Sequence, residues 1–128
     1  MKKLIIRTIP HKKQRYNTSG DYFETPSATQ IRVSNLKNDN YEFLIALHEL
    51  VEYKLITEKG IRIEDIDRFD KKFEADRLKG KHSKEAEPGD ALDSPYRLEH
   101  QFATYIEGLM AVKLGVDWIK YSQAVLKL

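Results

Sequence analysis

A histidine and two glutamates fall within five positions of a segment that is otherwise mostly apolar. Residues 47–53 read LHELVEY, so His48, Glu49 and Glu52 stand among leucines and a valine. Imidazole and carboxylate groups at this spacing can share protons, carry out acid–base chemistry or bind a divalent cation. Because the chain contains no cysteine, any metal site must be built from histidine and carboxylate side chains.

Helical geometry places these polar groups beside a face that we expect to be buried. That face has apolar residues at helical spacing: Leu44, Leu47, Val51 and Leu55. With Leu44 at zero, His48 lies at about 40° and Glu52 at about 80° around an ideal helix, while Ile45 follows at about 100°. The two polar residues are therefore bracketed by apolar ones. Glu49 lies at about 140°, at the edge of the same arc.

A later segment repeats the pattern. His100 and Glu107 lie about 20° apart around a helix. The apolar stripe around them is formed by Tyr96, Ala103, Met110 and Ala111. Two long helices in a small domain are expected to pack such stripes together, which would bring both histidines, Glu52 and Glu107 into one partly buried cluster. Burying an unpaired carboxylate costs several kcal/mol, so the cluster must either share protons in a hydrogen-bond network or bind a cation.

A bound cation would have a natural ligand set. His48, Glu52 and His100 supply three ligands, which leaves a coordination position for water, as a catalytic zinc site requires. Glu107 is a candidate third or fourth ligand. Zinc suits two imidazoles, and a set with two carboxylates would also suit manganese or iron. Glu49 would then be the catalytic residue that takes a proton from water at the ion.

The helix resembles the H-E-x-x-H helix of the zincin metallopeptidases. His48 and Glu49 match the first ligand and the general base, whereas Glu52 occupies the position of the second histidine. The resemblance implies that His100 supplies the missing imidazole from a later helix. A strand at 30–34 before the helix is similar to the edge strand that borders the zincin cleft. The implied function is a small metal-dependent hydrolase, such as a peptidase, with a peptide or protein substrate.

Two other functions fit the same residues. The first is a non-catalytic phage or host-interaction protein with a structural His/Glu cluster. The pattern ALHELVEYKL, followed by GI, PYRLEHQFATYIE and LGVDW, resembles small bacterial and phage proteins, and this resemblance implies no particular activity. Helical nucleotide pyrophosphohydrolases bind magnesium through E-x-x-E, the spacing of Glu49 and Glu52. Nearby histidines fit that chemistry poorly, because magnesium prefers oxygen ligands.

The elements that position these residues predict a single α+β domain over 1–128. Residues 1–35 are expected to be β-rich, with strands at 4–9, 21–24 and 30–34 in a small, mainly antiparallel sheet. Residues 38–128 are expected to be helical, with helices at 40–57, 64–73, 95–114 and after Asp117, and with a polar loop at 79–94. Asp39 is the expected N-cap of the first helix, with Glu42 in its first turn, and Ser94 with Pro95 is expected to begin the third.

The overall composition excludes some classes of protein. The chain carries 22 basic and 20 acidic residues, so a general nucleic-acid binder is not expected, despite the basic run at 12–15. Tyr16, Tyr22 and Phe23 near that run are expected to cover a small sheet rather than to stack on bases. No apolar run reaches the length of about 20 residues that spans a bilayer, so we expect a cytoplasmic protein. His11 and His82 lie in polar segments and are expected to be solvated.

Overall fold

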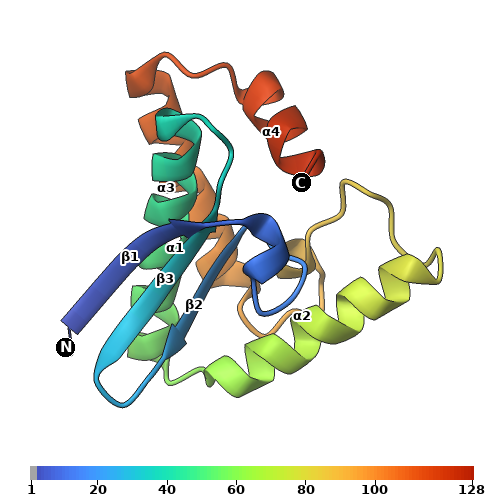
Figure 1. Ribbon diagram of the computed structural model, residues 1–128. Helices are drawn as coiled ribbons and strands as arrows, with labels where there is room; N and C mark the ends of the chain where they lie inside the picture. The colour runs from blue at the N-terminus through green and yellow to red at the C-terminus, as the bar shows by residue number, and fades with distance from the viewer. Residues whose placement is uncertain (1–2) are drawn as a thin grey trace.

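The computed structural model describes residues 3–128 and has an α+β fold, as predicted (Figure 1). A three-stranded sheet precedes four helices. The strands are β1 (Lys3–Ile9), β2 (Gly20–Glu24) and β3 (Ala28–Ser34), and the helices are α1 (Asp39–Lys59), α2 (Ile63–Leu78), α3 (Arg97–Leu114) and α4 (Trp118–Leu126). Two 3-10 turns, η1 (His11–Lys13) and η2 (Pro88–Asp90), lie in the connections. The second helix extends beyond the predicted end at Phe73 to Leu78.

The sheet is mixed, with strand order β1-β3-β2. Strand β3 inserts between the other two, so β1 and β3 are parallel neighbours while β2 and β3 pair antiparallel. The expectation of a mainly antiparallel sheet is therefore wrong for one of its two pairings. The segment 30–34 is also not an edge strand. It belongs to the central strand β3, in which every residue except the half-buried Arg32 is buried.

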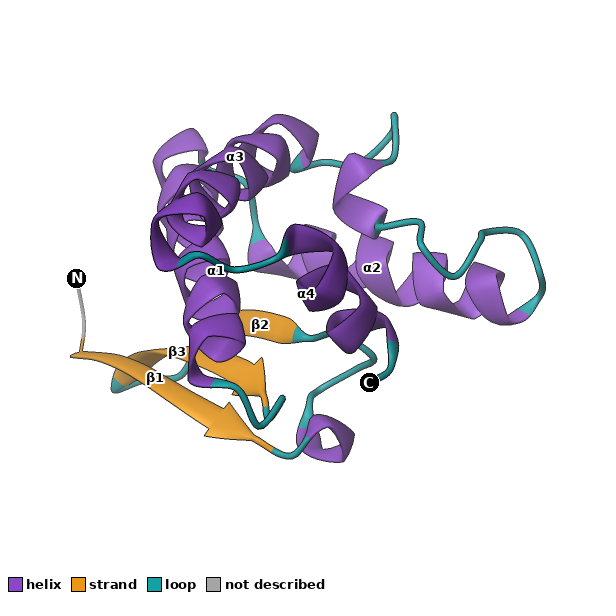
Figure 2. Cartoon of the chain, turned by 90° about the horizontal axis from the view of Figure 1, so that it is seen from above, coloured by secondary structure: helices purple, strands orange, loops and turns teal. Residues whose placement is uncertain are grey.

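Helix α1 lies on the sheet, and α3 packs along the opposite side of α1 (Figure 2). This double contact gives α1 a wide buried arc. Of the four apolar residues expected to form its buried face, Leu44 is fully buried and the other three are only partly buried. The buried side chains of α1 are instead Leu44, Ile45, Glu49, Glu52, Tyr53 and Ile56. Two glutamates thus lie in the interior, where their charges require compensation.

The N-terminus of α1 is capped one residue earlier than predicted. The side chain of Asn38, not Asp39, accepts a hydrogen bond from the backbone N–H of Tyr41 at 3.0 Å. Glu42 reaches back beyond the cap and accepts from the backbone N–H of Leu36 at 2.8 Å. These contacts fix how the chain passes from β3 into α1, and with it the direction of the polar residues about three to four turns later.

Helix α3 begins later than its sequence signal predicts. Ser94 and Pro95 belong to a turn in which the Ser94 hydroxyl accepts from the backbone N–H of Tyr96 at 3.3 Å, and the helix starts at Arg97. Helix α4 follows Asp117 as predicted, and the Asp117 side chain caps it by accepting from two backbone N–H groups of its first turn. Within residues 3–128, no helix has the length and apolar character needed to cross a membrane.

The polar segments around the two remaining histidines are packed against the fold. His11 contacts the Ser34 hydroxyl at 2.8 Å and the Asn17 side chain at 3.0 Å. His82 stacks on Phe73 with ring centroids 3.7 Å apart. Both histidines are half-buried, so the expectation that they are solvated holds only in part. Their loops fold back onto the sheet and onto α2, which covers side chains that an extended loop would expose.

Candidate metal centre

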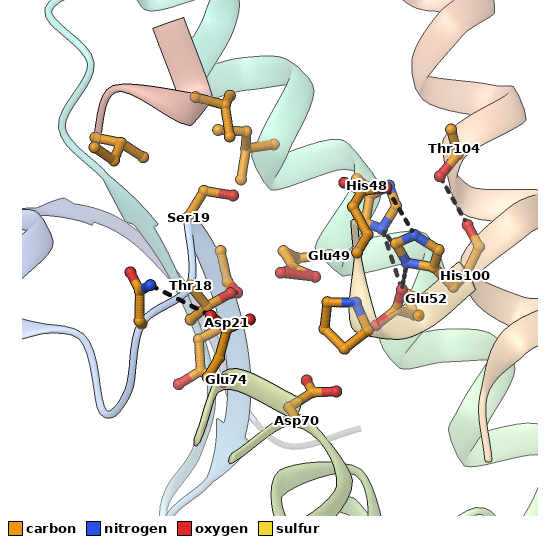
Figure 3. A pocket seen from close by; sticks show the side chains of 18 of the residues that line it. Thr18, Ser19, Asp21, His48, Glu49, Glu52, Asp70, Glu74, His100 and Thr104 are labelled. Carbon is orange, nitrogen blue, oxygen red and sulfur yellow. Dashed lines mark hydrogen bonds and ion pairs between the residues drawn. The ribbon is translucent and has the colours of Figure 1, made fainter. Parts of the chain in front are cut away.

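A cavity of about 630 Å³ lies between β2, the four helices and the loop 79–94 (Figure 3). Strand β2, the sheet edge nearest α2, borders it on one side, and α1 and α3 form the opposite wall. His48, Glu49 and Glu52 reach this space from α1, and His100 reaches it from α3. The predicted packing of the two helices therefore directs their polar side chains into a shared cavity.

Three side-chain atoms meet at one point of this wall. The Oε2 atom of Glu52 lies 3.1 Å from Nε2 of His48 and 2.9 Å from Nδ1 of His100. The two imidazole nitrogens are 3.2 Å apart. Their side chains are only 5–12% exposed, so water does little to solvate their charges. These three residues form a compact triangle of ligand-type atoms, as a His/Glu cation site requires.

Each corner of the triangle is held from behind by a residue of another element. His48 directs its other ring nitrogen, Nδ1, to Oε1 of Glu107 at 2.8 Å. The second oxygen of Glu107 accepts from the hydroxyl of Tyr121 on α4 at 2.5 Å. The free oxygen of Glu52 accepts from the hydroxyl of Tyr22 on β2 at 2.8 Å. Outer partners of this kind fix the orientation of metal-binding imidazoles and carboxylates.

The third corner is held by the loop 79–94. Nε2 of His100 lies 3.4 Å from a carboxylate oxygen of Glu87 and 3.7 Å from one of Asp90. The loop approaches closely at Gly89, where an added Cβ atom would overlap the imidazole ring of His100. A side chain at this position would displace the imidazole, so glycine is required for the loop to close over it.

Without a cation, the cluster is a network of charged hydrogen bonds. Burial alone would lower the pKa of both histidines, but the hydrogen bonds to Glu107 and Glu52 raise that of His48, and those to Glu52 and Glu87 raise that of His100 to about 10. Burial would raise the pKa of Glu52, but its contacts with the two histidines lower it to about 2. A bound cation would take the place of protons on these atoms, because metal ligands are deprotonated.

Glu49 differs from its neighbours because no residue within 3–128 forms a hydrogen bond or ion pair with its carboxylate. The side chain is 9% exposed and projects into the cavity (Figure 3). Burial, followed by the charge of Glu52, raises its pKa well above the usual value. It lies over Gly20, where an added Cβ would come within 2.6 Å of its Oε1 atom. The absence of a side chain on β2 at this point leaves room for the carboxylate.

The structure brings together His48, Glu52 and His100, three of the four residues predicted as metal ligands. Glu107 lies elsewhere, against the far nitrogen of His48, and does not join the triangle. His100 also belongs to a second possible group with Glu87 and Asp90, but both of those carboxylates are exposed. The predicted base, Glu49, lines the same cavity as the three ligand candidates.

Several residues of the site are not indicated by the sequence patterns. The spacing around Tyr22 predicts a face of the sheet, and that around Tyr121 predicts a terminal helix, but neither indicates a hydroxyl contact with a buried carboxylate. Glu87 and Gly89 lie in the loop that is notable in the sequence only for its length and polarity. That length is the available signal, because loops longer than about 12–15 residues in compact domains are often functional.

Comparisons with profiles of known protein families, with curated proteins and with solved structures give no match to this chain. The resemblance to zincins therefore rests on the residues of α1 and on His100 alone. Inferences about function come from the geometry of the cavity.

Proposed function

We propose that the protein is a small metal-dependent hydrolase whose ion is bound by His48, Glu52 and His100. The observation that carries the proposal is the triangle of two imidazole nitrogens and one carboxylate oxygen, with edges of 2.9, 3.1 and 3.2 Å. Three tetrahedral ligands at 2.0–2.1 Å from zinc are about 3.3 Å apart. Small outward movements of these side chains would therefore accommodate the ion.

The donor atoms favour zinc. Two imidazoles and one carboxylate are a ligand set of catalytic zinc sites, in which the fourth position is left for water or substrate. The outer partners Glu107, Tyr22 and Glu87 would keep the ligands oriented before the ion arrives. Manganese and iron are the other candidates, because carboxylate-rich surroundings also suit these ions.

Glu49 is the proposed general base. A zinc ion in such a site lowers the pKa of water and polarises the bond to be cleaved. Glu49 lies one position after His48 on the same helix, faces the same cavity and has no competing partner within residues 3–128. Burial raises the pKa of Glu49 above its usual value, which favours the acceptance of a proton. A peptide or protein substrate and a cytoplasmic location remain predictions that accompany this proposal.

A non-catalytic role is the second candidate, and one observation favours it. The three contacts that would enclose an ion are also within hydrogen-bond distance, so shared protons satisfy the cluster as it stands. In that case His48, Glu52 and His100 would serve only to join α1 to α3, as in a phage or host-interaction protein. Magnesium-dependent nucleotide hydrolysis is not proposed, because Glu52 lies between two imidazoles.

The variant Glu49→Gln separates the two candidates. It preserves size and removes the base, so hydrolysis by metal-loaded protein should fall by a factor on the order of 10² or more, with metal content unchanged. The assay begins with a screen of peptide and ester substrates using zinc-loaded wild type. Glu58→Gln, an exposed position on the same helix, is the matched control and should retain full activity. Absence of turnover by the wild type across the screen would favour the non-catalytic role.

A further inference from the structure

Helix α3 carries a second pattern on the side that faces away from the cavity. Five large apolar side chains are exposed along its outer surface, by 51–78%. They are Leu98, Phe102, Tyr105, Leu109 and Val112, and we call them the outer α3 stripe. His100 and Glu107 lie about 180–200° from Leu98 around the helix, so the stripe and the candidate metal centre occupy opposite faces.

The spacing of the stripe is that of a helix–helix seam. Its members alternate at intervals of four and three residues, which keeps them within an arc of about 80° over four turns. No charged residue lies within the arc. Gln101 borders it on one side and Lys113 on the other. A face that is apolar and uncharged along its whole length is complementary to another helix face of the same kind.

The area of the stripe is large for a monomer. Phe and Tyr bury on the order of 150–250 Å² each and Leu and Val somewhat less, so the five side chains at these exposures present roughly 500–600 Å². That is the upper limit of a single patch on an ordinary monomer. Leu92, which is 90% exposed, lines the same surface hollow as Leu98 and extends the patch beyond the helix. The sum approaches the area of about 800 Å² per partner found in stable interfaces.

We propose that the outer α3 stripe is a dimer interface that pairs antiparallel with the stripe of a second copy of this chain. A two-fold interface requires a surface complementary to itself, and the order Leu-Phe-Tyr-Leu-Val presents a similar profile when reversed. A parallel pair would set the two Lys113 side chains side by side and align the two helix dipoles. The antiparallel pair opposes the dipoles and places the two Lys113 side chains at opposite ends of the interface.

The test is the mass of the protein in solution. Sedimentation equilibrium of the full chain, up to submillimolar concentration, should give twice the 15.0 kDa of one chain. Leu109→Glu should raise the dissociation constant on the order of 100-fold or more, because it buries two unpaired carboxylates at the interface. Leu78→Glu is the matched control: Leu78 on α2 is 90% exposed and lies outside the stripe, so this variant should stay dimeric.

A monomeric wild type at every concentration would overturn the proposal, and so would a Leu109→Glu variant that dimerises as the wild type does. Far-UV circular dichroism establishes that the variant is folded. If it is not, Tyr105→Lys replaces it, with the same expected loss of the dimer.

The orientation has its own test, because the chain has no cysteine. Under oxidation, Tyr105→Cys, near the middle of the stripe, should form a disulfide-linked dimer, whereas Leu98→Cys, at one end, should not. Equal crosslinking of the two variants would contradict the antiparallel arrangement.

Discussion

Two walls of the cavity, one formed by α2 and the other by α1 and α3, compensate buried carboxylates in different ways. On the α2 wall, Asp70 accepts hydrogen bonds from the hydroxyls of Tyr16 at 3.0 Å and Tyr96 at 2.6 Å, and Asp67 pairs with Arg15 at 2.8 Å. None of these partners is an imidazole that could release a proton and bind a metal ion. On the α1–α3 wall, Glu52 meets two imidazoles at one point, and Glu49 has no partner among residues 3–128.

This difference separates a structural polar network from a candidate reaction site. Neutral hydroxyl donors and a guanidinium satisfy carboxylates permanently, because neither loses its proton at neutral pH. Imidazoles can exchange a proton for a cation. A buried carboxylate without a partner is costly, and such groups are found at functional sites, where they accept a proton from a substrate or water. The α2 wall should therefore matter to stability, and the α1–α3 wall to metal binding and turnover.

Of the changes that test this difference between the walls, removal of a bound metal should have the largest effect on stability. A ligand bound only by the folded state stabilises it by about 4 kcal/mol when present at 1,000 times its dissociation constant. Chelation of zinc-loaded protein should lower the free energy of unfolding by this order, and His100→Ala should make the protein insensitive to chelator. His82→Ala, which removes a histidine outside the centre, should keep the sensitivity. Urea unfolding with and without chelator measures both, and identical wild-type curves would contradict the prediction.

Asp70→Ala should weaken the opposite wall. Loss of this carboxylate leaves the hydroxyls of Tyr16 and Tyr96 without their acceptor, at a cost of about 2–4 kcal/mol in the free energy of unfolding. Zinc content should not change. Asp65→Ala, which removes an exposed carboxylate paired with Arg68 on the same helix, should cost no more than about 0.5 kcal/mol. A loss of metal in Asp70→Ala would show that the two walls are not separable.

Asp70 should also contribute to the pH dependence of the free energy of unfolding. Burial raises the pKa of Asp70 from 3.8 to about 7, against the opposing effect of its tyrosine hydrogen bonds. Because the folded state holds this proton more tightly than the unfolded state, the contribution to stability is complete below pH 4 and is lost as the pH rises to about 7. Urea unfolding of wild type and Asp70→Asn across this range should show a steeper loss of stability with rising pH in the wild type.

A smaller effect is expected from an outer partner of the candidate metal centre. Tyr121→Phe removes the hydroxyl that holds Glu107, which in turn orients His48, so zinc affinity should fall about 10-fold. Tyr41→Phe is the matched control, because the ring of Tyr41 packs against Tyr121 but its hydroxyl has no hydrogen bond within residues 3–128. Competition with a chromophoric zinc chelator measures both affinities. An equal decrease in the two variants would indicate a packing effect instead.

Helical periodicity fixes the direction of each side chain around its helix, which is why it could place three of the four ligand candidates in one cluster. It failed for Glu107 because direction says nothing of height. Seven residues separate Glu107 from His100, which is about 10 Å along the helix axis, so one ion cannot meet both. Glu107 therefore contacts Nδ1 of His48, the ring nitrogen that does not belong to the triangle.

Local sequence patterns do not predict the hydrogen-bond partners of the cluster. Tyr22, Tyr121 and Glu87 come from the sheet, the terminal helix and the loop, and only the packing of these elements brings them to α1 and α3. The prediction of a mainly antiparallel sheet failed for β1 and β3 for a similar reason. Alternation of polar and apolar residues at 30–34 predicts one covered face, whereas Gln30 is also buried on the other face of β3.

The zinc content of the wild type measured beside that of His100→Ala tests the central claim most directly. After equilibration with zinc and exhaustive dialysis, elemental analysis should find one ion per wild-type chain and far less in the variant, with both proteins folded by circular dichroism. Cobalt substituted for zinc should give the visible absorption of a tetrahedral site in the wild type only. A wild type that retains no more zinc than His100→Ala would contradict the account, and the His/Glu cluster would then be a structural network.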